Sequence, residues 1–227
     1  MLIENEIFLR CDKEDIVNGV VTIPEGVLEI GENVFRERED IQKVVLPEGM
    51  KKIGFFSFYR CKNLTEINLP ESIREIEPVA FSGCGKLKNI KLPKNLKSLG
   101  DSSFDCTAIE QIEVPNVNVI LEGTFAGCKN LKEVKLNDNI EDICFSAFVG
   151  CEKLESIKFP ENLKKIEFQA FKECKSLTKI KIPKNVQEIE YEAFADCTNL
   201  TKIIIPKNVK IGEDCFKNCQ ISSYEEY

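Results

Sequence analysis

Hydrophobic positions recur along this chain with a period of about 23 residues. A phenylalanine marks each period; most intervals are 23 residues, one is 21 and the last is 22. The recurring residues are Phe35, Phe58, Phe81, Phe104, Phe125, Phe148, Phe171, Phe194 and Phe216. A repeat of this length cannot bury its apolar side alone, so the period predicts a solenoid of stacked turns with one continuous core.

The elements of one turn can be read from residues 193–211. Apolar residues between 193 and 200 have spacings of one, three and three, which predicts a short helix or 3₁₀ turn. Ile203 and Ile205 alternate with residues that face solvent, as in a short strand with one buried face. Pro206 ends this strand because proline donates no ladder hydrogen bond. The pattern therefore predicts an α/β solenoid with a parallel sheet.

A proline and a cysteine recur in step with the phenylalanine. The prolines are Pro24, Pro47, Pro70, Pro93, Pro115, Pro160, Pro183 and Pro206, and Asn137 takes the one missing position. The cysteines are Cys61, Cys84, Cys106, Cys128, Cys151, Cys174, Cys197 and Cys219. We expect a buried ladder of reduced thiols, since a buried cysteine behaves as a small hydrophobe. If any thiol reacts, we expect it to be Cys144, which should point outward, or Cys11.

The pattern I-P-x-x-V-x-x-I-x-x-x-A-F-x-x-C-x-x-L-x-x-I-x-I-P resembles the BspA-type leucine-rich repeats, also called the Treponema pallidum type. The match runs from about Val20 to Cys219. The resemblance implies a right-handed superhelix of about nine turns of ~23 residues, with the parallel sheet on its concave face. It also implies a role like that of bacterial and protist surface proteins, which mediate adhesion and protein binding.

We expect one domain over 1–227, with an N-terminal cap at 1–19, repeats at 20–219 and a polar tail at 220–227 that covers the last strand. The repeat is two residues short between Phe104 and Phe125. A shortened turn cannot stack in the same register as its neighbours, so we predict a local change of curvature there.

Charge and composition narrow the function. The chain has 31 basic and 38 acidic residues, a net charge of −7, which argues against nucleic-acid binding because that needs a positive field. No histidine is present, so the commonest general base and metal ligand is missing. No phosphate loop, dinucleotide motif or metal cluster stands out. We expect no enzyme activity, no cofactor and no metal.

Lysines gather on the predicted strands of the later turns, and two of them, Lys184 and Lys207, lie just past the prolines. The whole set is Lys135, Lys158, Lys179, Lys181, Lys184, Lys202 and Lys207. Stacked like charges are mildly destabilising, so their presence suggests an acidic partner that docks on the concave face. The alternative is that lysine is simply a well-solvated residue on a sheet surface.

A second candidate surface is aromatic. Phe145, Phe168 and Tyr191 each follow a buried isoleucine by two residues on consecutive turns, so they should stack into one stripe. Exposed contiguous aromatics are typical of protein contacts. Alternatively, the rings lie flat along the outer wall as local packing.

The most favoured function is a non-catalytic scaffold for protein–protein interaction, with a protein partner, no nucleic acid and no membrane span, acting as a monomer. The alternative is an adhesin-type surface or secreted module that contacts host matrix proteins or glycans. The N-terminal segment shows no secretory signal, and the cysteines are of the reduced type, which favours a cytoplasmic location. The resemblance favours the cell surface instead.

Overall fold

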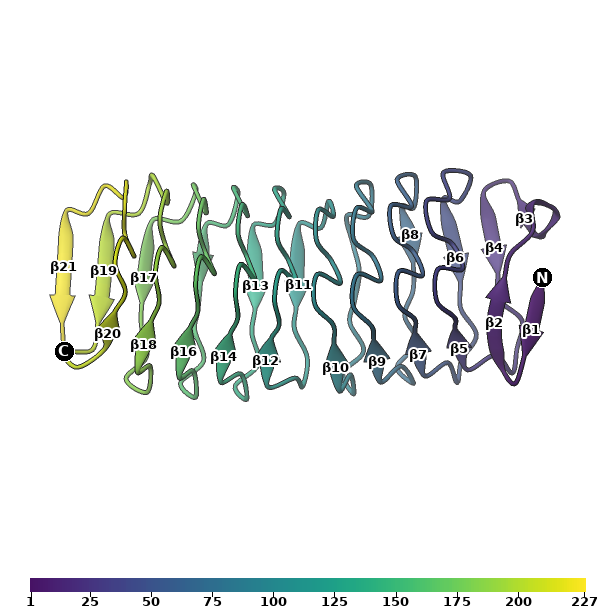
Figure 1. Cartoon of the computed structure of the whole chain (residues 1–227), viewed down its shortest axis with the longest axis horizontal. Coiled ribbons are helices and arrows are strands. Elements are labelled where there is room, and N and C mark those ends of the chain that lie inside the picture. The colour runs from purple at the N-terminus through teal and green to yellow at the C-terminus, as the bar shows by residue number, and fades with distance from the viewer.

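The computed structural model describes all 227 residues as a β-solenoid in which the two termini lie at opposite ends of the long axis (Figure 1). Short strands form two rows along that axis. The opposite sides of nearly every turn supply one strand to each row, so the core lies between the rows. No α-helix is present, and the one helical element is the 3₁₀ helix η1 (Lys13–Asp15).

The proline-side row contains the strands that precede the prolines. Its strands are β4 (Val20–Thr22), β6 (Lys43–Val45), β8 (Glu66–Ile67), β11 (Gln111–Glu113), β13 (Glu133–Lys135), β15 (Ser156–Ile157), β17 (Lys179–Lys181), β19 (Lys202–Ile205) and β21 (Ser223–Glu226). The pairing is parallel but interrupted, because β8 does not pair with β11 and β15 does not pair with β17.

The opposite row contains the strands that precede the phenylalanines. They are β5 (Glu29–Ile30), β7 (Lys52–Ile53), β9 (Glu75–Ile76), β10 (Ser98–Leu99), β12 (Val119–Ile120), β14 (Asp142–Ile143), β16 (Lys165–Ile166), β18 (Glu188–Ile189) and β20 (Lys210–Ile211). Register places identical repeat positions side by side, as for Ile30, Ile53 and Ile76. This row is interrupted once, between β10 and β12.

Of the two predictions for the segment around each phenylalanine, a short helix or a 3₁₀ turn, the helix is absent, and the segment forms hydrogen-bonded turns instead. Two residues per turn have positive φ, one on each side of the ring, as at Ser146 (53°) and Gly150 (69°) around Phe148. The N–H of Phe148 donates to the carbonyl of Ala170 in the next turn at 2.8 Å, while the carbonyl of Phe148 accepts the N–H of Cys151, three residues on, at 3.2 Å, so bonds between turns alternate with single local turns and no continuous helix forms. Glycine recurs at Gly150 and its equivalents Gly83 and Gly127 because it adopts positive φ without steric cost.

The phenylalanines form one stack through the molecule, with ring centroids 5.0 to 6.0 Å apart and interplanar angles of at most 21°. Their burial was predicted and is complete for every member except the last, Phe216, which is partly buried. Phe8 adds a tenth ring that the sequence pattern did not reveal. The solenoid therefore has about ten turns, because residues 1–19 supply one more than the expected nine.

The cysteine ladder is present, and its thiols are hydrogen-bond donors. The Sγ of Cys151 donates to the carbonyl of Phe125 at 3.2 Å, and equivalent bonds recur at other turns. The assignment of Cys106 to the ladder is wrong, because this residue is exposed and lies at the positive-φ position (55°) instead of the ladder position. Thr107 occupies that ladder position, and its hydroxyl donates to the carbonyl of Phe104 at 2.9 Å.

Both ends carry extra strands. At the N-terminal end, β1 (Leu2–Glu4) pairs antiparallel with β2 (Ile7–Arg10), and β3 (Ile16–Val17) pairs antiparallel with β4. The strand β2 then pairs parallel with β5, which joins this hairpin to the opposite row. At the C-terminal end, β21 pairs parallel with β19 over four residues, so the tail continues the sheet.

Candidate binding surfaces

The lysines of the last turns lie on exposed positions of the proline-side row. Lys179 on β17 is the direct register partner of Lys202 on β19, so two ammonium groups occupy adjacent strands. Lys158 and Lys179 are exposed, and neither forms an ion pair within the chain. Side chains on neighbouring parallel strands lie about 4.8 Å apart, so these positive charges act on the same part of the surface.

The chain's own tail engages part of this surface. The ammonium group of Lys202 forms an ion pair with the carboxylate of Glu225 on β21. This bond lowers the pKa of Glu225. Lys181 lies over the ring of Tyr227, with its Nζ 5.6 Å from the centroid, and the Tyr227 hydroxyl donates to the carbonyl of Ile182 at 2.8 Å. An acidic, aromatic segment therefore already lies against one edge of the lysines.

Three other lysines from the predicted set have different surroundings. Lys135 is paired with Glu113 on β11 at 2.7 Å, which raises the pKa of Lys135. Lys184 and Lys207 follow Pro183 and Pro206 and line a surface hollow together with the ring of Tyr227. The sequence placed these lysines on one face, but it did not reveal that Glu113 and the tail neutralise some of them.

The three rings of the aromatic stripe, Phe145, Phe168 and Tyr191, stack on one another, as their spacing predicts. Phe145 and Phe168 stack with centroids 5.2 Å apart, and Phe168 and Tyr191 stack at 5.4 Å. Only Tyr191 is exposed, at 40%. Because neighbouring rings cover each other's faces, the surface of the stripe consists mainly of ring edges.

Carboxylates hold the stripe in place. Glu167 accepts a hydrogen bond from the backbone N–H of Phe145 at 3.0 Å, and Glu190 accepts one from the N–H of Phe168 at 2.9 Å. Glu190 also pairs with Lys165 at 2.5 Å. These acids therefore satisfy backbone donors of the preceding turn.

A second aromatic cluster near the N-terminal end was missed from the sequence. The Arg36 guanidinium lies 5.2 Å from the Phe56 ring centroid and 5.4 Å from that of Tyr59, and Arg60 lies 5.0 Å from Tyr59. Phe56 is at a positive-φ position (53°) that most other turns fill with glycine or a polar residue; Val79 is the other apolar case. The available signal was the concentration of arginine before position 75.

The thiols are arranged for packing and not for reactivity. Burial raises the pKa of Cys61 and that of Cys128 to about 12. Cys11 is buried, and burial raises the pKa of half-buried Cys144 to about 12. Both were expected to be the accessible thiols, but Cys106 is the exposed one, and its pKa is raised to about 11, mainly by desolvation. A thiol with so high a pKa carries little thiolate near neutral pH.

The structure holds no cluster of three or more histidine, cysteine, aspartate or glutamate side chains with metal-binding geometry. None of its helical segments has the length and hydrophobicity to cross a membrane.

Comparison with known proteins agrees with the repeat architecture. The family model described as the BspA type leucine-rich repeat region (6 copies) matches residues 2–132 and 118–225. The chain belongs to this family. Repeats of this kind generally serve as non-enzymatic binding scaffolds. A comparison with curated proteins found no match.

Solved structures of leucine-rich repeat proteins share the fold. One from Bacteroides ovatus ATCC 8483 has a TM-score of 0.80 and 28% identity, and the alignment covers 100% of this chain and 74% of that one. One from Eubacterium ventriosum ATCC 27560 has a TM-score of 0.52 and 14% identity, with 90% and 83% covered.

Proposed function

We propose that this chain is a non-catalytic scaffold that binds an acidic protein partner through the lysines of its last turns. The proposal rests on Lys179 and Lys202, which are register partners on adjacent strands, and on Lys158 in the preceding turn. Neither Lys158 nor Lys179 forms an ion pair within the chain. Adjacent like charges lower the stability of a sheet slightly, so an external anionic surface would gain from neutralising them. The face is the one that the family resemblance assigns to the concave side.

The tail supports an acidic partner and not nucleic acid. Glu225 reaches Lys202 from a parallel strand, so carboxylates on an extended segment fit the spacing of these lysines. Phosphate recognition favours arginine, yet no arginine lies beyond Arg74, and the net charge is −7. We further propose that the chain acts as a monomer.

The test is a quantitative capture experiment with the triple variant Lys158→Glu, Lys179→Glu, Lys181→Glu. Proteins bound by wild type and lost by the variant should be acidic. Their binding should weaken as the salt concentration rises from about 50 to about 500 mM, because the Debye length then falls from about 14 to about 4 Å. Urea unfolding of the variant must match wild type, so that loss of folding does not explain the result.

A matched control reverses the charge of Lys86 and of Lys153. Both are exposed in the loops after the cysteines, and their ammonium groups donate only to asparagine side chains of the preceding turn. This variant should retain the partners. If the triple variant retains them too, the lysine proposal is wrong. Binding should then be sought at the stripe, with Phe168→Ala and Tyr191→Ala, and among extracellular matrix proteins and glycans.

A further inference from the structure

The last strand of the proline-side row, β21, buries less apolar surface than the strands before it. Its register with β19 places Tyr224 beside Ile203, which is fully buried. Tyr224 itself is 48% exposed. The same register places Glu226, an exposed carboxylate, beside the buried Ile205. The side chains of β21 therefore contribute little of the apolar burial that holds the other turns together.

Backbone hydrogen bonds hold β21 in place. The N–H of Ser223 donates to the carbonyl of Thr201 at 3.0 Å, and the N–H of Tyr227 donates to the carbonyl of Ile205 at 3.2 Å. No strand pairs with the other edge of β21. Hydrogen bonds at an uncovered edge with few buried side chains open locally at a much smaller free-energy cost than those of the core. We therefore expect β21 to detach while the turns before it stay folded.

Three contacts place residues 223–227 on the lysine surface, which consists of Lys158, Lys179, Lys181 and Lys202. Glu225 forms the ion pair with Lys202, and the ring centroid of Tyr227 lies 5.6 Å from the Nζ of Lys181. The hydroxyl of Tyr227 donates to the carbonyl of Ile182, which is 45 positions earlier in the chain. Residues 223–227 thus contact two turns of the surface and leave Lys158 and Lys179 exposed.

The ion pair between Glu225 and Lys202 can be exchanged for an external one. The side chain of Lys202 is 36% exposed and that of Glu225 is 51% exposed, so water and salt screen their attraction. A partner that offers several carboxylates would replace this one screened pair with several. The acidic partner and residues 223–227 therefore require the same ammonium group.

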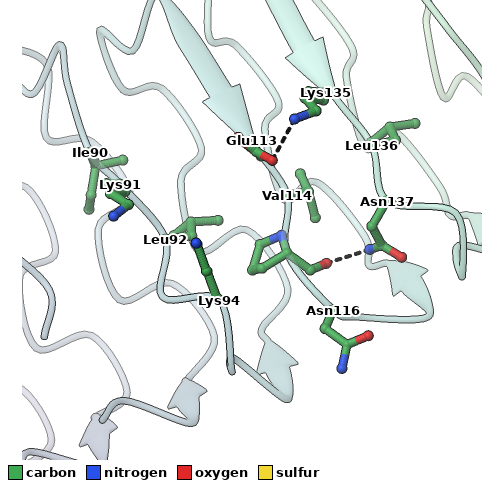
Figure 2. A pocket seen from close by; sticks show the side chains of 11 residues that line it. Ile90, Lys91, Leu92, Lys94, Glu113, Val114, Asn116, Lys135, Leu136 and Asn137 are labelled. Carbon is green, nitrogen blue, oxygen red and sulfur yellow. Dashed lines mark hydrogen bonds and ion pairs between the residues drawn. The ribbon is translucent and has the colours of Figure 1, made fainter. Parts of the chain in front are cut away.

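The pair of Glu113 with Lys135 differs, although it also joins neighbouring strands of the same row. Figure 2 shows it at the rim of a cavity of about 370 Å³ that is lined by Leu92 and Val114. On β11, Glu113 stands between Ile112 and Val114, which are both buried. Its carboxylate cannot leave Lys135 by detachment of the strand unless a turn of the core unfolds. The corresponding neighbours of Glu225 on β21 are not buried, so this strand can leave.

We propose that residues 223–227 compete with the acidic partner for Lys181 and Lys202. In a closed form these residues occupy both lysines, and the partner reaches only Lys158 and Lys179. In an open form β21 is detached, and all four lysines contact the partner. Because the partner binds the open form more tightly, its binding shifts the population toward that form. This inference rests on the proposed function, since it concerns the regulation of the same surface.

The experiment compares Glu225→Gln with Glu226→Gln in the full chain. Both substitutions remove one negative charge from β21, but only Glu225 forms an ion pair. The probe is fluorescein-labelled hexaglutamate, and its affinity is measured by fluorescence anisotropy at about 50 mM salt. Glu225→Gln should bind the probe about two- to fivefold more tightly than Glu226→Gln, which is the factor that corresponds to one exposed ion pair. Tyr227→Ala should also bind it more tightly than wild type, because this change uncovers Lys181.

Amide exchange measured by NMR reports the state of β21 directly. Saturation of the wild type with hexaglutamate should speed exchange at Ser223 and Tyr227, because their hydrogen bonds to β19 break in the open form. Ile182 is the control, since its N–H donates to the carbonyl of Ile204 at 2.8 Å and does not depend on β21. Its exchange should stay slow.

Equal or weaker binding by Glu225→Gln than by Glu226→Gln would overturn the inference. Unchanged exchange at Ser223 and Tyr227 in the saturated complex would overturn it as well. If either result is found while the Lys158/Lys179/Lys181 variant loses the probe, the lysine proposal stands and only the role of β21 is wrong. Absence of binding up to millimolar probe, or equal binding by wild type and that variant, would overturn both.

Discussion

Removal of one ring from the centre of the phenylalanine stack gives the sharpest test of how the turns cooperate. Phe171 is fully buried and stacks on Phe148 at 5.1 Å and on Phe194 at 5.2 Å. It also meets Phe159 edge-on at 5.5 Å. The terminal ring, Phe216, is only partly buried and has one partner, Phe194, at 5.7 Å.

The magnitude follows from burial and ring contacts. Truncation of a buried phenylalanine to alanine costs about 3–5 kcal/mol, and the three ring contacts of Phe171 place it at the upper part of that range. Phe216→Ala should cost about half as much, since part of the ring already contacts water and only one ring contact is lost. Phe168→Ala, in the outer stripe, should cost about 1–2 kcal/mol.

The assay is urea unfolding followed by circular dichroism and by tyrosine fluorescence. Solenoids can unfold in sections, because each turn contacts only its neighbours. The two probes must therefore coincide before a free energy of unfolding is derived. A central truncation that uncouples the halves would separate the two probes, which is itself evidence for coupling through the stack.

Equal losses in the free energy of unfolding at Phe171 and Phe216 would refute this prediction, because the expected difference comes from the number of rings stacked on each. A loss below about 1 kcal/mol at Phe171 would do so as well, since no well-packed core accommodates a cavity of that size at so small a cost.

Three further predictions concern single groups. Ser57→Ala and Ser103→Ala should each raise the free energy of unfolding by about 1 kcal/mol, measured by urea titration, because both buried hydroxyls lack a hydrogen-bond partner; a loss of stability would show that they have one. Iodoacetamide should modify Cys106 before Cys151, increasingly as pH approaches 11, since burial keeps the pKa of Cys151 well above its usual value; peptide mass mapping that finds Cys151 first would contradict this. Glu192 has a pKa lowered to about 2, mainly by Lys172, so the wild type should lose stability as pH falls from about 4.5 toward 2, and Glu192→Gln should show a smaller loss in thermal melts over that interval; parallel curves would remove Glu192 as the cause.

The sign of the last effect follows from linkage. A carboxyl group whose pKa is lower in the folded chain stabilises the fold above the unfolded pKa, and this stabilisation disappears as pH falls through the folded pKa. The bonds to Glu192 from Gln169 at 2.7 Å and Lys172 at 2.5 Å are made to the charged form. Protonation weakens both.

The repeat sequence alone determined the stacked architecture. The period placed Phe58, Phe81 and seven other rings at equivalent positions, and the structure stacks all nine. The spacing of isoleucine before proline located the proline-side strands. Lys179 and Lys202 are register partners on the proline-side row, and Phe145, Phe168 and Tyr191 stack on consecutive turns, because alternation in a strand and equivalence between turns both follow from sequence position. Whether these surfaces bind a partner stays a prediction.

Several features were decided only by the tertiary structure. Apolar spacing could not separate a helix from the observed turns, because spacing reports which side is buried but not the sign of φ at Ser146 or Gly150. Cys106 was assigned to the ladder because the missing residue could be placed before or after it; stacking against Cys128 selects Thr107 for that position. The tail was expected to cover the last strand, but its formation of a further parallel strand, β21, was not evident from the sequence, since this pairing joins residues 21 positions apart.

The cavity beside Leu92 and Val114 was likewise decided only by the tertiary structure. Each segment reads as an ordinary repeat, and the cavity appears only where a missing backbone ladder meets a shortened loop in the adjacent turn. A one-dimensional pattern fixes which residues are buried in a solenoid, because every turn repeats the same division between core and solvent. It does not fix how well two particular turns match, because that depends on hydrogen-bond distances between chain segments that only the packed structure defines.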